Sequence, residues 1–106
     1  MMSVGILGTG QALPEKVITN QDLEKIVETS DQWITERTGI KERRQAAPNE
    51  TTSTLSVQAA RKALAMAGVE PRDLDLIVCS TISPDMPLPS TAAFIQRDLG
   101  ARACCA

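Results

Sequence analysis

The apolar run Leu76–Cys79 is the feature that most constrains the fold, because it follows an amphipathic helix pattern after a short turn. The helix pattern covers Ser53–Ala67 and ends at Gly68, and its apolar stripe consists of Val57, Ala60, Leu64 and Ala67. A continuous apolar run is typical of a parallel strand covered on both faces, so we expect such a strand at Leu74–Ser80. A helix that leads into a parallel strand indicates an α/β fold with helices layered on a mainly parallel sheet.

The residues before this helix supply two further elements of that fold. Ser3–Leu7 is apolar and is predicted to form a short buried strand, which Gly8 closes. Thr19 or Asn20 can cap a helix, whose core side is formed by Leu23, Ile26 and Val27.

Two more helices have local start and stop signals. Ser30 can cap a short helix that Gly39 would end, and Ser90 can cap another that runs to Leu99. Three prolines make residues 84–89 a stiff loop that cannot pair in a sheet. A further apolar run begins at residues 103–106.

Composition excludes several classes of protein. Hydrophobic residues make up 42% and charged residues 23% of the chain, a balance that supports a packed core. The net charge of -2 and the scarcity of aromatic residues, which are Trp33 and Phe94 alone, argue against a nucleic-acid partner. The apolar runs are too short for a membrane span, and the start lacks the pattern of a secretory signal. We therefore expect a cytoplasmic protein without a membrane partner.

The cysteines predict neither a metal site nor a catalytic pair. Cys79, Cys104 and Cys105 match no metal-ligand spacing, and the chain contains no histidine. A reactive thiol needs a helix N-terminus or a cationic neighbour, and neither is evident for any of the three. We expect all three to be inert small hydrophobes, so an enzyme built on this chain needs machinery that lies elsewhere.

The pair Gly8 and Gly10 has two interpretations. Two glycines with one residue between them are part of a dinucleotide-binding loop, but the third glycine is missing and no helix follows directly. We therefore favour a tight turn at the end of the strand.

Trp33 and Arg37 lie four residues apart on one predicted helix and so share a face. A flat aromatic ring beside a fixed cation can stack on a nucleobase and hold a phosphate. The alternative is a tryptophan that covers the edge of the core, with an arginine in solvent, and spacing alone favours that alternative. Lys41, Arg43 and Arg44 are predicted to be a solvated face.

A set of short motifs at fixed spacing, which covers essentially the whole chain, resembles the opening of β-ketoacyl-acyl carrier protein synthase III. The set consists of Ile6-Leu7-Gly8-Thr9-Gly10, Leu13-Pro14, Thr19-Asn20, Asp22-Leu23-Glu24, Thr29-Ser30-Asp31, Trp33-Ile34, Arg37-Thr38-Gly39-Ile40, Glu42-Arg43, Ala47-Pro48-Asn49-Glu50-Thr51, Leu76-Ile77-Val78 and Pro89-Ser90. The resemblance implies that residues 1–106 are the N-terminal portion of a thiolase-like domain.

The resemblance also implies a homodimeric acyltransferase of fatty acid synthesis. An acyl group, usually acetyl, passes from coenzyme A to a cysteine and is condensed with malonyl-acyl carrier protein, with coenzyme A as substrate and no cofactor. Trp33 matches the residue that stacks on the adenine of coenzyme A, with Thr29, Arg37 and Thr38 around the nucleotide. Leu88 matches a position that limits the acyl pocket across the dimer, where some relatives have a bulky aromatic residue.

The catalytic cysteine, histidine and asparagine of the family are all expected beyond Ala106, because the matching segment stops before the nucleophile elbow. The segment alone is then expected to be inactive. Two alternatives remain: a related condensing enzyme of secondary metabolism, and a non-catalytic module complete at Ala106. The second is disfavoured because parallel strands without partners leave backbone groups unpaired.

Overall fold

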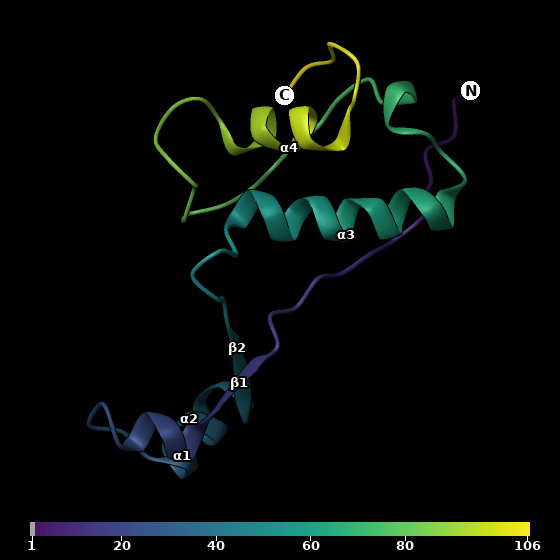
Figure 1. The fold of residues 1–106 in the computed structure, drawn as a ribbon. Coiled ribbons are helices and arrows are strands. Elements are labelled where there is room, and N and C mark those ends of the chain that lie inside the picture. The colour runs from purple at the N-terminus through teal and green to yellow at the C-terminus, as the bar shows by residue number, and fades with distance from the viewer. Residues whose placement is uncertain (1) are drawn as a thin grey trace. The chain divides into compact units, whose positions relative to one another are not determined.

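The computed structural model describes residues 2–106, and these form two compact units (Figure 1). The first unit comprises residues up to 12 together with 50–106, and the second comprises Leu13–Asn49. Within the described residues, none of the helices has the length and apolar character needed to cross a membrane.

The second unit combines two short helices with a two-stranded sheet. Its elements are β1 (Lys16–Thr19), α1 (Asn20–Glu24), α2 (Asp31–Thr38) and β2 (Glu42–Gln45). The strands are antiparallel, and their register pairs Lys16 with Gln45 and Thr19 with Glu42. This sheet was not predicted, because the polar sequence of β2 lacks the apolar alternation by which a strand is recognised.

The helices of this unit start where capping residues stand. Thr19 caps α1, and its hydroxyl and backbone N–H exchange hydrogen bonds with Asp22 in a capping box. Ser30 caps α2, which ends at Gly39 with a φ of 72°. The first of these helices is shorter than predicted, since it ends at Glu24. Ile26 is therefore 73% exposed, and the prediction that it packs in a core is wrong.

The first unit is built on α3 (Thr52–Ala67) and α4 (Thr91–Leu99), which pack side by side (Figure 1). A short 3-10 helix, η1 (Pro71–Asp73), follows α3. The buried core is formed by Val57, Ile95 and Leu99, and these are contacted by Ala60, Leu64, Leu74, Ile77 and Cys79. The predicted caps Ser90 and Gly68 and the predicted helix ranges are confirmed to within one residue.

Of the two predicted strands of this unit, the parallel strand at Leu74–Ser80 forms in part and the buried strand at Ser3–Leu7 does not form. Among residues 2–106, Ser3–Leu7 makes no ladder, and Val4 is 98% exposed, so the prediction of a buried strand is wrong there. Residues 74–80 make a single parallel bridge, in which Ile77 N donates to Cys105 O at 2.8 Å. Val78, on the opposite face to Ile77, is 79% exposed, so this segment is covered on one face rather than two.

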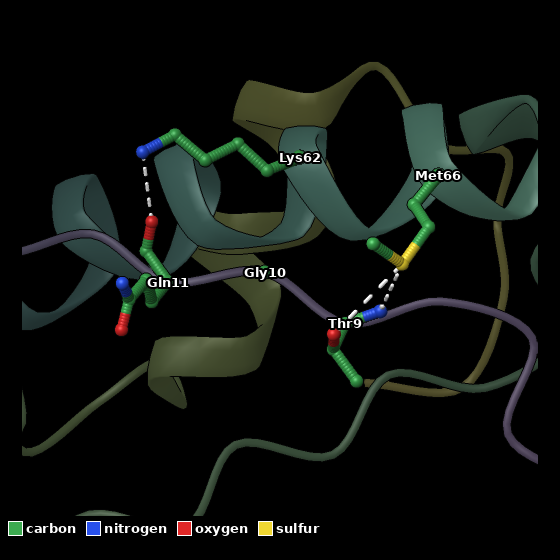
Figure 2. Close-up of a pocket in the computed structure, with 5 residues that line it drawn as sticks. All are labelled: Thr9, Gly10, Gln11, Lys62 and Met66. Carbon is green, nitrogen blue, oxygen red and sulfur yellow. Dashed lines mark hydrogen bonds between the residues drawn. The ribbon is translucent and has the colours of Figure 1, made fainter.

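Gly8 and Gly10 lie directly against the backbone of α3. Figure 2 shows Gly10 in this position. A Cβ atom on Gly8 would be 2.3 Å from Ala63 O, and one on Gly10 would be 2.2 Å from Ala59 O. Neither glycine has a positive φ. The glycines therefore permit close approach to a helix, which replaces the predicted tight turn.

Candidate functional site

A pocket of about 270 Å³ lies at the start of α2 and is lined by Glu28, Thr29, Ser30 and Trp33. Two of these residues, Thr29 and Trp33, were predicted to bind coenzyme A. Glu28 was not singled out in the sequence, and Ser30 was predicted only as a helix cap. Ser30 lines the pocket as the N-cap of α2, and Glu28 precedes that cap by two residues.

The capped start of α2 decides which way Trp33 faces. Ser30 Oγ accepts a hydrogen bond from Trp33 N at 3.1 Å, and Ile34 N donates to Ser30 O at 3.0 Å. Ile34 takes the buried side of the helix, so its neighbour Trp33 faces outward and is 57% exposed. The alternative that Trp33 covers the core edge is not supported by this exposure.

Arg37 follows Trp33 by one turn and lies over its ring. The guanidinium carbon is 5.9 Å from the centre of the indole, which is the geometry of a cation–π contact. The contact holds a cation over one face of an exposed flat ring. Such a surface can stack a nucleobase and attract a phosphate.

Thr38 ends α2 and has its hydroxyl engaged with the backbone. Its Oγ1 donates to Ile34 O at 2.7 Å and accepts from Ile40 N at 3.0 Å. The side chain is exposed but does not line the pocket beside Trp33. Thr29 and Trp33 thus line one pocket, and Arg37 contacts the Trp33 ring without lining that pocket. Thr38 neither lines the pocket nor contacts the ring.

Leu88 belongs to the first unit, in the loop that precedes α4, and is 82% exposed.

Asp85 anchors the loop that precedes α4 to the start of α3, because its carboxylate accepts hydrogen bonds from Ser53 N, at 2.9 Å, and from Ser53 Oγ. The Ser53 hydroxyl, more than any other group, lowers the pKa of Asp85. Thr52 adds a hydrogen bond to Ser83 O at 2.6 Å.

Asn20 and Arg43 are the supporting residues that the sequence did not reveal. Asn20 is buried beneath α2, and its Oδ1 accepts a hydrogen bond from Arg43 Nη2 at 2.7 Å. The prediction that Arg43 belongs to a solvated face is therefore wrong, since its guanidinium donates a hydrogen bond to a buried amide.

Asp22 in the α1 capping box has a pKa of about 2, chiefly because its carboxylate accepts a hydrogen bond from Thr19 N.

The three cysteines occupy separate places in the first unit. Cys79 packs against the core cluster. Cys104 Sγ accepts from Gln96 Nε2 at 3.5 Å, and Cys105 is exposed in an extended segment. None of them lies at a helix N-terminus, the position that stabilises a thiolate.

Known proteins are similar to this chain in sequence and in fold, although no family model matches it. The β-ketoacyl-[acyl-carrier-protein] synthase III of Symbiobacterium thermophilum is 59% identical over 98 residues, which are 92% of this chain and 30% of that protein. The crystal structure of 3-oxoacyl-[acyl-carrier-protein] synthase III from Aquifex aeolicus superposes with a TM-score of 0.89 at 52% identity, over 95% of this chain and 32% of that one.

A second solved structure extends the comparison. The priming β-ketosynthase of the R1128 polyketide pathway has a TM-score of 0.85 at 35% identity, and the match covers 95% of this chain and 31% of that one. The chain thus spans about a third of the length of each of these three proteins. The predicted thiolase-like α/β fold class is confirmed by these structures. As its sequence motifs predicted, the chain is homologous to about a third of a β-ketoacyl-[acyl-carrier-protein] synthase III.

Proposed function

We propose that this chain supplies the coenzyme A contacts of an acyltransferase that condenses an acyl group, acetyl above all, with malonyl-acyl carrier protein to start a fatty acid. The observation that carries the proposal is the exposed Trp33 ring, which borders a pocket and has the Arg37 guanidinium 5.9 Å from its centre. The homology to proteins named for this condensation supports it.

Each site residue has a distinct role in the proposal. Trp33 stacks on the adenine, and Arg37 pairs with a phosphate of the nucleotide through its guanidinium. Thr29, which is half-buried in the pocket wall, offers a hydroxyl to the edge of the base. Thr38 lies in the last turn of α2, and its hydroxyl is bonded to the backbone at Ile34 O and Ile40 N. In the proposal it gives up one of these two hydrogen bonds and contacts the nucleotide end of coenzyme A instead.

The chemistry of the proposed enzyme takes place outside residues 1–106. A cysteine beyond Ala106 accepts the acyl group as a thioester, and a histidine and an asparagine, also beyond Ala106, stabilise charge on the thioester oxygen during decarboxylation. Coenzyme A is a substrate and no cofactor takes part. The enzyme is a cytoplasmic homodimer, and Leu88 of each protomer borders the acyl pocket of the other.

The second candidate function is the priming of a polyketide, which the match to the R1128 ketosynthase favours. In both candidates the leucine at position 88 leaves a pocket that admits longer or branched acyl groups. Activity of the complete enzyme on acetyl, isobutyryl and octanoyl coenzyme A tests this point. Strict preference for acetyl would contradict the role of Leu88.

The coenzyme A site is tested by calorimetric titration of the complete enzyme with coenzyme A. Stacking of one base on an aromatic ring contributes about 1 to 3 kcal/mol, so Trp33→Ala should raise Kd about 5- to 150-fold. Arg37→Ala should also weaken binding, whereas Arg97→Ala should not. Arg97 is a matched control because it lies 5.3 Å from the ring of Phe94 on another helix. Equal affinity in wild type and Trp33→Ala would refute the site.

A further inference from the structure

Asn20 has the most deeply buried large side chain of the described residues, with 1% of its surface exposed. It is the first residue of α1, in the unit that also carries Trp33. A buried side-chain amide must satisfy two N–H donors and an oxygen acceptor. The hydrogen-bond partners of the Asn20 amide therefore show which segments it fixes relative to one another.

The donors of Asn20 are directed at both ends of α2. Nδ2 donates to Asp31 Oδ1 at 2.7 Å and to Ile40 O at 2.8 Å. Asp31 is the first residue of α2, and Ile40 lies two residues past its final residue, Thr38. One amide group thus spans the helix that carries Trp33 and Arg37.

The acceptor and the backbone of Asn20 are tied to the sheet. Oδ1 accepts from Arg43 Nη2 at 2.7 Å, and the other guanidinium nitrogen, Nη1, donates to Ile18 O at 3.3 Å. Asn20 N donates to Lys41 O at 3.2 Å. α2 is therefore linked to β1 and β2 through Asn20 and its partner Arg43.

A second contact closes the loop that forms the other wall of the pocket. Glu24 Oε1 accepts from Asp31 N at 2.6 Å, so the end of α1 is joined to the start of α2. Residues 25–30 lie between these two points, and the last three of them line the pocket beside Trp33. Asp31 is the residue at which both contacts meet.

We infer that Asn20 is the positioning residue of the Trp33 site: its buried amide fixes α2 so that the affinity for coenzyme A depends on a side chain that does not line the pocket. The inference rests on the proposed function for the identity of the ligand. Aspartate at this position would direct a carboxylate oxygen at Asp31 Oδ1 or Ile40 O, which are both acceptors. Asn20→Asp keeps the volume and the acceptor of Arg43 but replaces the Nδ2 donor with an acceptor.

The experiment uses the fact that Trp33 is the only tryptophan and that the chain has no tyrosine. The near-ultraviolet circular dichroism of Trp33 is recorded without ligand, and its fluorescence is then titrated with coenzyme A. We expect Asn20→Asp to alter the ligand-free tryptophan spectrum and to raise Kd at least tenfold. The control Ser53→Ala removes a buried, hydrogen-bonded side chain from the first unit and should change neither signal.

A milder variant keeps the inference testable if Asn20→Asp fails to fold. Asp31→Ala removes an exposed acceptor of the Asn20 amide and should shift both signals in the same direction by less. Its matched control is Gln32→Ala, on the same helix, where the side chain bonds only to Glu36. Equal effects of the two exposed variants would overturn the inference.

The two readouts separate the inference from the proposed function. If wild type binds no coenzyme A while Asn20→Asp still alters the tryptophan spectrum, the ligand assignment fails and the positioning role stands. If wild type binds and a folded Asn20→Asp shows the same spectrum and Kd, the positioning role is refuted and the ligand assignment stands.

Discussion

Gly10→Ala should destabilise the first unit strongly, because the added methyl group has no space. Its Cβ would lie 2.2 Å from Ala59 O, 2.7 Å from Ala63 N and 2.9 Å from the Cβ of Lys62. The first of these distances is more than 1 Å below the 3.4 Å at which ordinary contact begins. Two of the three obstacles are backbone atoms of α3, so no rotation of a side chain relieves the overlap.

The size of the effect follows from what has to move. Separation of residues 8–11 from α3 would break the hydrogen bond from Lys62 Nζ to Gln11 O, which measures 2.9 Å, and expose the Ala59 and Ala63 side of the helix (Figure 2). Overpacking of this kind costs about 1 to 3 kcal/mol, and fixed backbone obstacles favour the upper end. In a domain of this size about 3 kcal/mol lowers Tm by about 12 to 24 °C.

The measurement is thermal unfolding of the chain followed by circular dichroism at the α-helical minimum. Gly5→Ala is the matched control, since it adds the same methyl group to the same segment with nothing within 4 Å. The control should keep the wild-type Tm to within the effect of an ordinary surface substitution, about 0.5 kcal/mol. Equal Tm values for the Gly10 and Gly5 variants would refute the close packing of residues 8–11 on α3.

Three further predictions concern stability in acid, the hydrogen bonds from Asp85 to α3, and the apolar core. Acidification should destabilise the chain through Asp22: its folded pKa of about 2 is below the ordinary 3.8, so its contribution is complete above pH 3.8 and is lost between 3.8 and about 2. Urea unfolding should show this loss in wild type and not in Asp22→Asn. Asp85→Ala should lower the free energy of unfolding by about 1 kcal/mol, as loss of a helix cap does, and an unchanged urea midpoint would contradict the anchoring role. Ile95→Ala should cost about 3 kcal/mol in the core, against less than about 0.5 kcal/mol for the exposed Ile26→Ala, and similar urea midpoints would contradict the core assignment.

Helix ends were predictable from sequence because their determinants lie within one turn. Ser30 and Ser90 each accept a hydrogen bond from an N–H three residues on, and Gly39 and Gly68 each adopt a positive φ. Such contacts do not depend on the remainder of the fold. The residue letters alone therefore locate these boundaries closely.

Strands were predicted less well, because a strand needs a partner that its own sequence does not name. Ser3–Leu7 has a strand's composition but no neighbouring ladder among the described residues, whereas polar Glu42–Gln45 pairs fully with β1. Backbone hydrogen bonds to Lys16–Thr19 outweigh the weak intrinsic preference of those polar side chains. An apolar pattern in the sequence predicts that a segment is buried. It does not predict that the segment has a neighbouring strand with which to form backbone hydrogen bonds.

In the candidate site, too, contacts between residues close in sequence were predictable and contacts between distant residues were not. Trp33 and Arg37 are four residues apart, so their contact follows from helical geometry once the helix is recognised. The partners of the Asn20 side chain, by contrast, lie 11, 15, 20 and 23 residues away along the sequence. No local pattern distinguishes such an asparagine from an ordinary helix cap, and the sequence offered it only as a candidate cap.

The second unit buries a polar amide and exposes its largest apolar ring, an arrangement that is expected if the proposed coenzyme A site is correct. A polar amide, Asn20, is buried while the largest apolar side chain, Trp33, is more than half exposed beside a buried Ile34. Burial of an aromatic ring would stabilise the unit, and a buried amide requires every partner to be in place, so stability alone does not favour this arrangement. The arrangement is explained if the exposed Trp33 ring stacks on a flat group from outside the chain. The hydrogen bonds of Asn20 then keep the helix that carries Trp33 in place for that group.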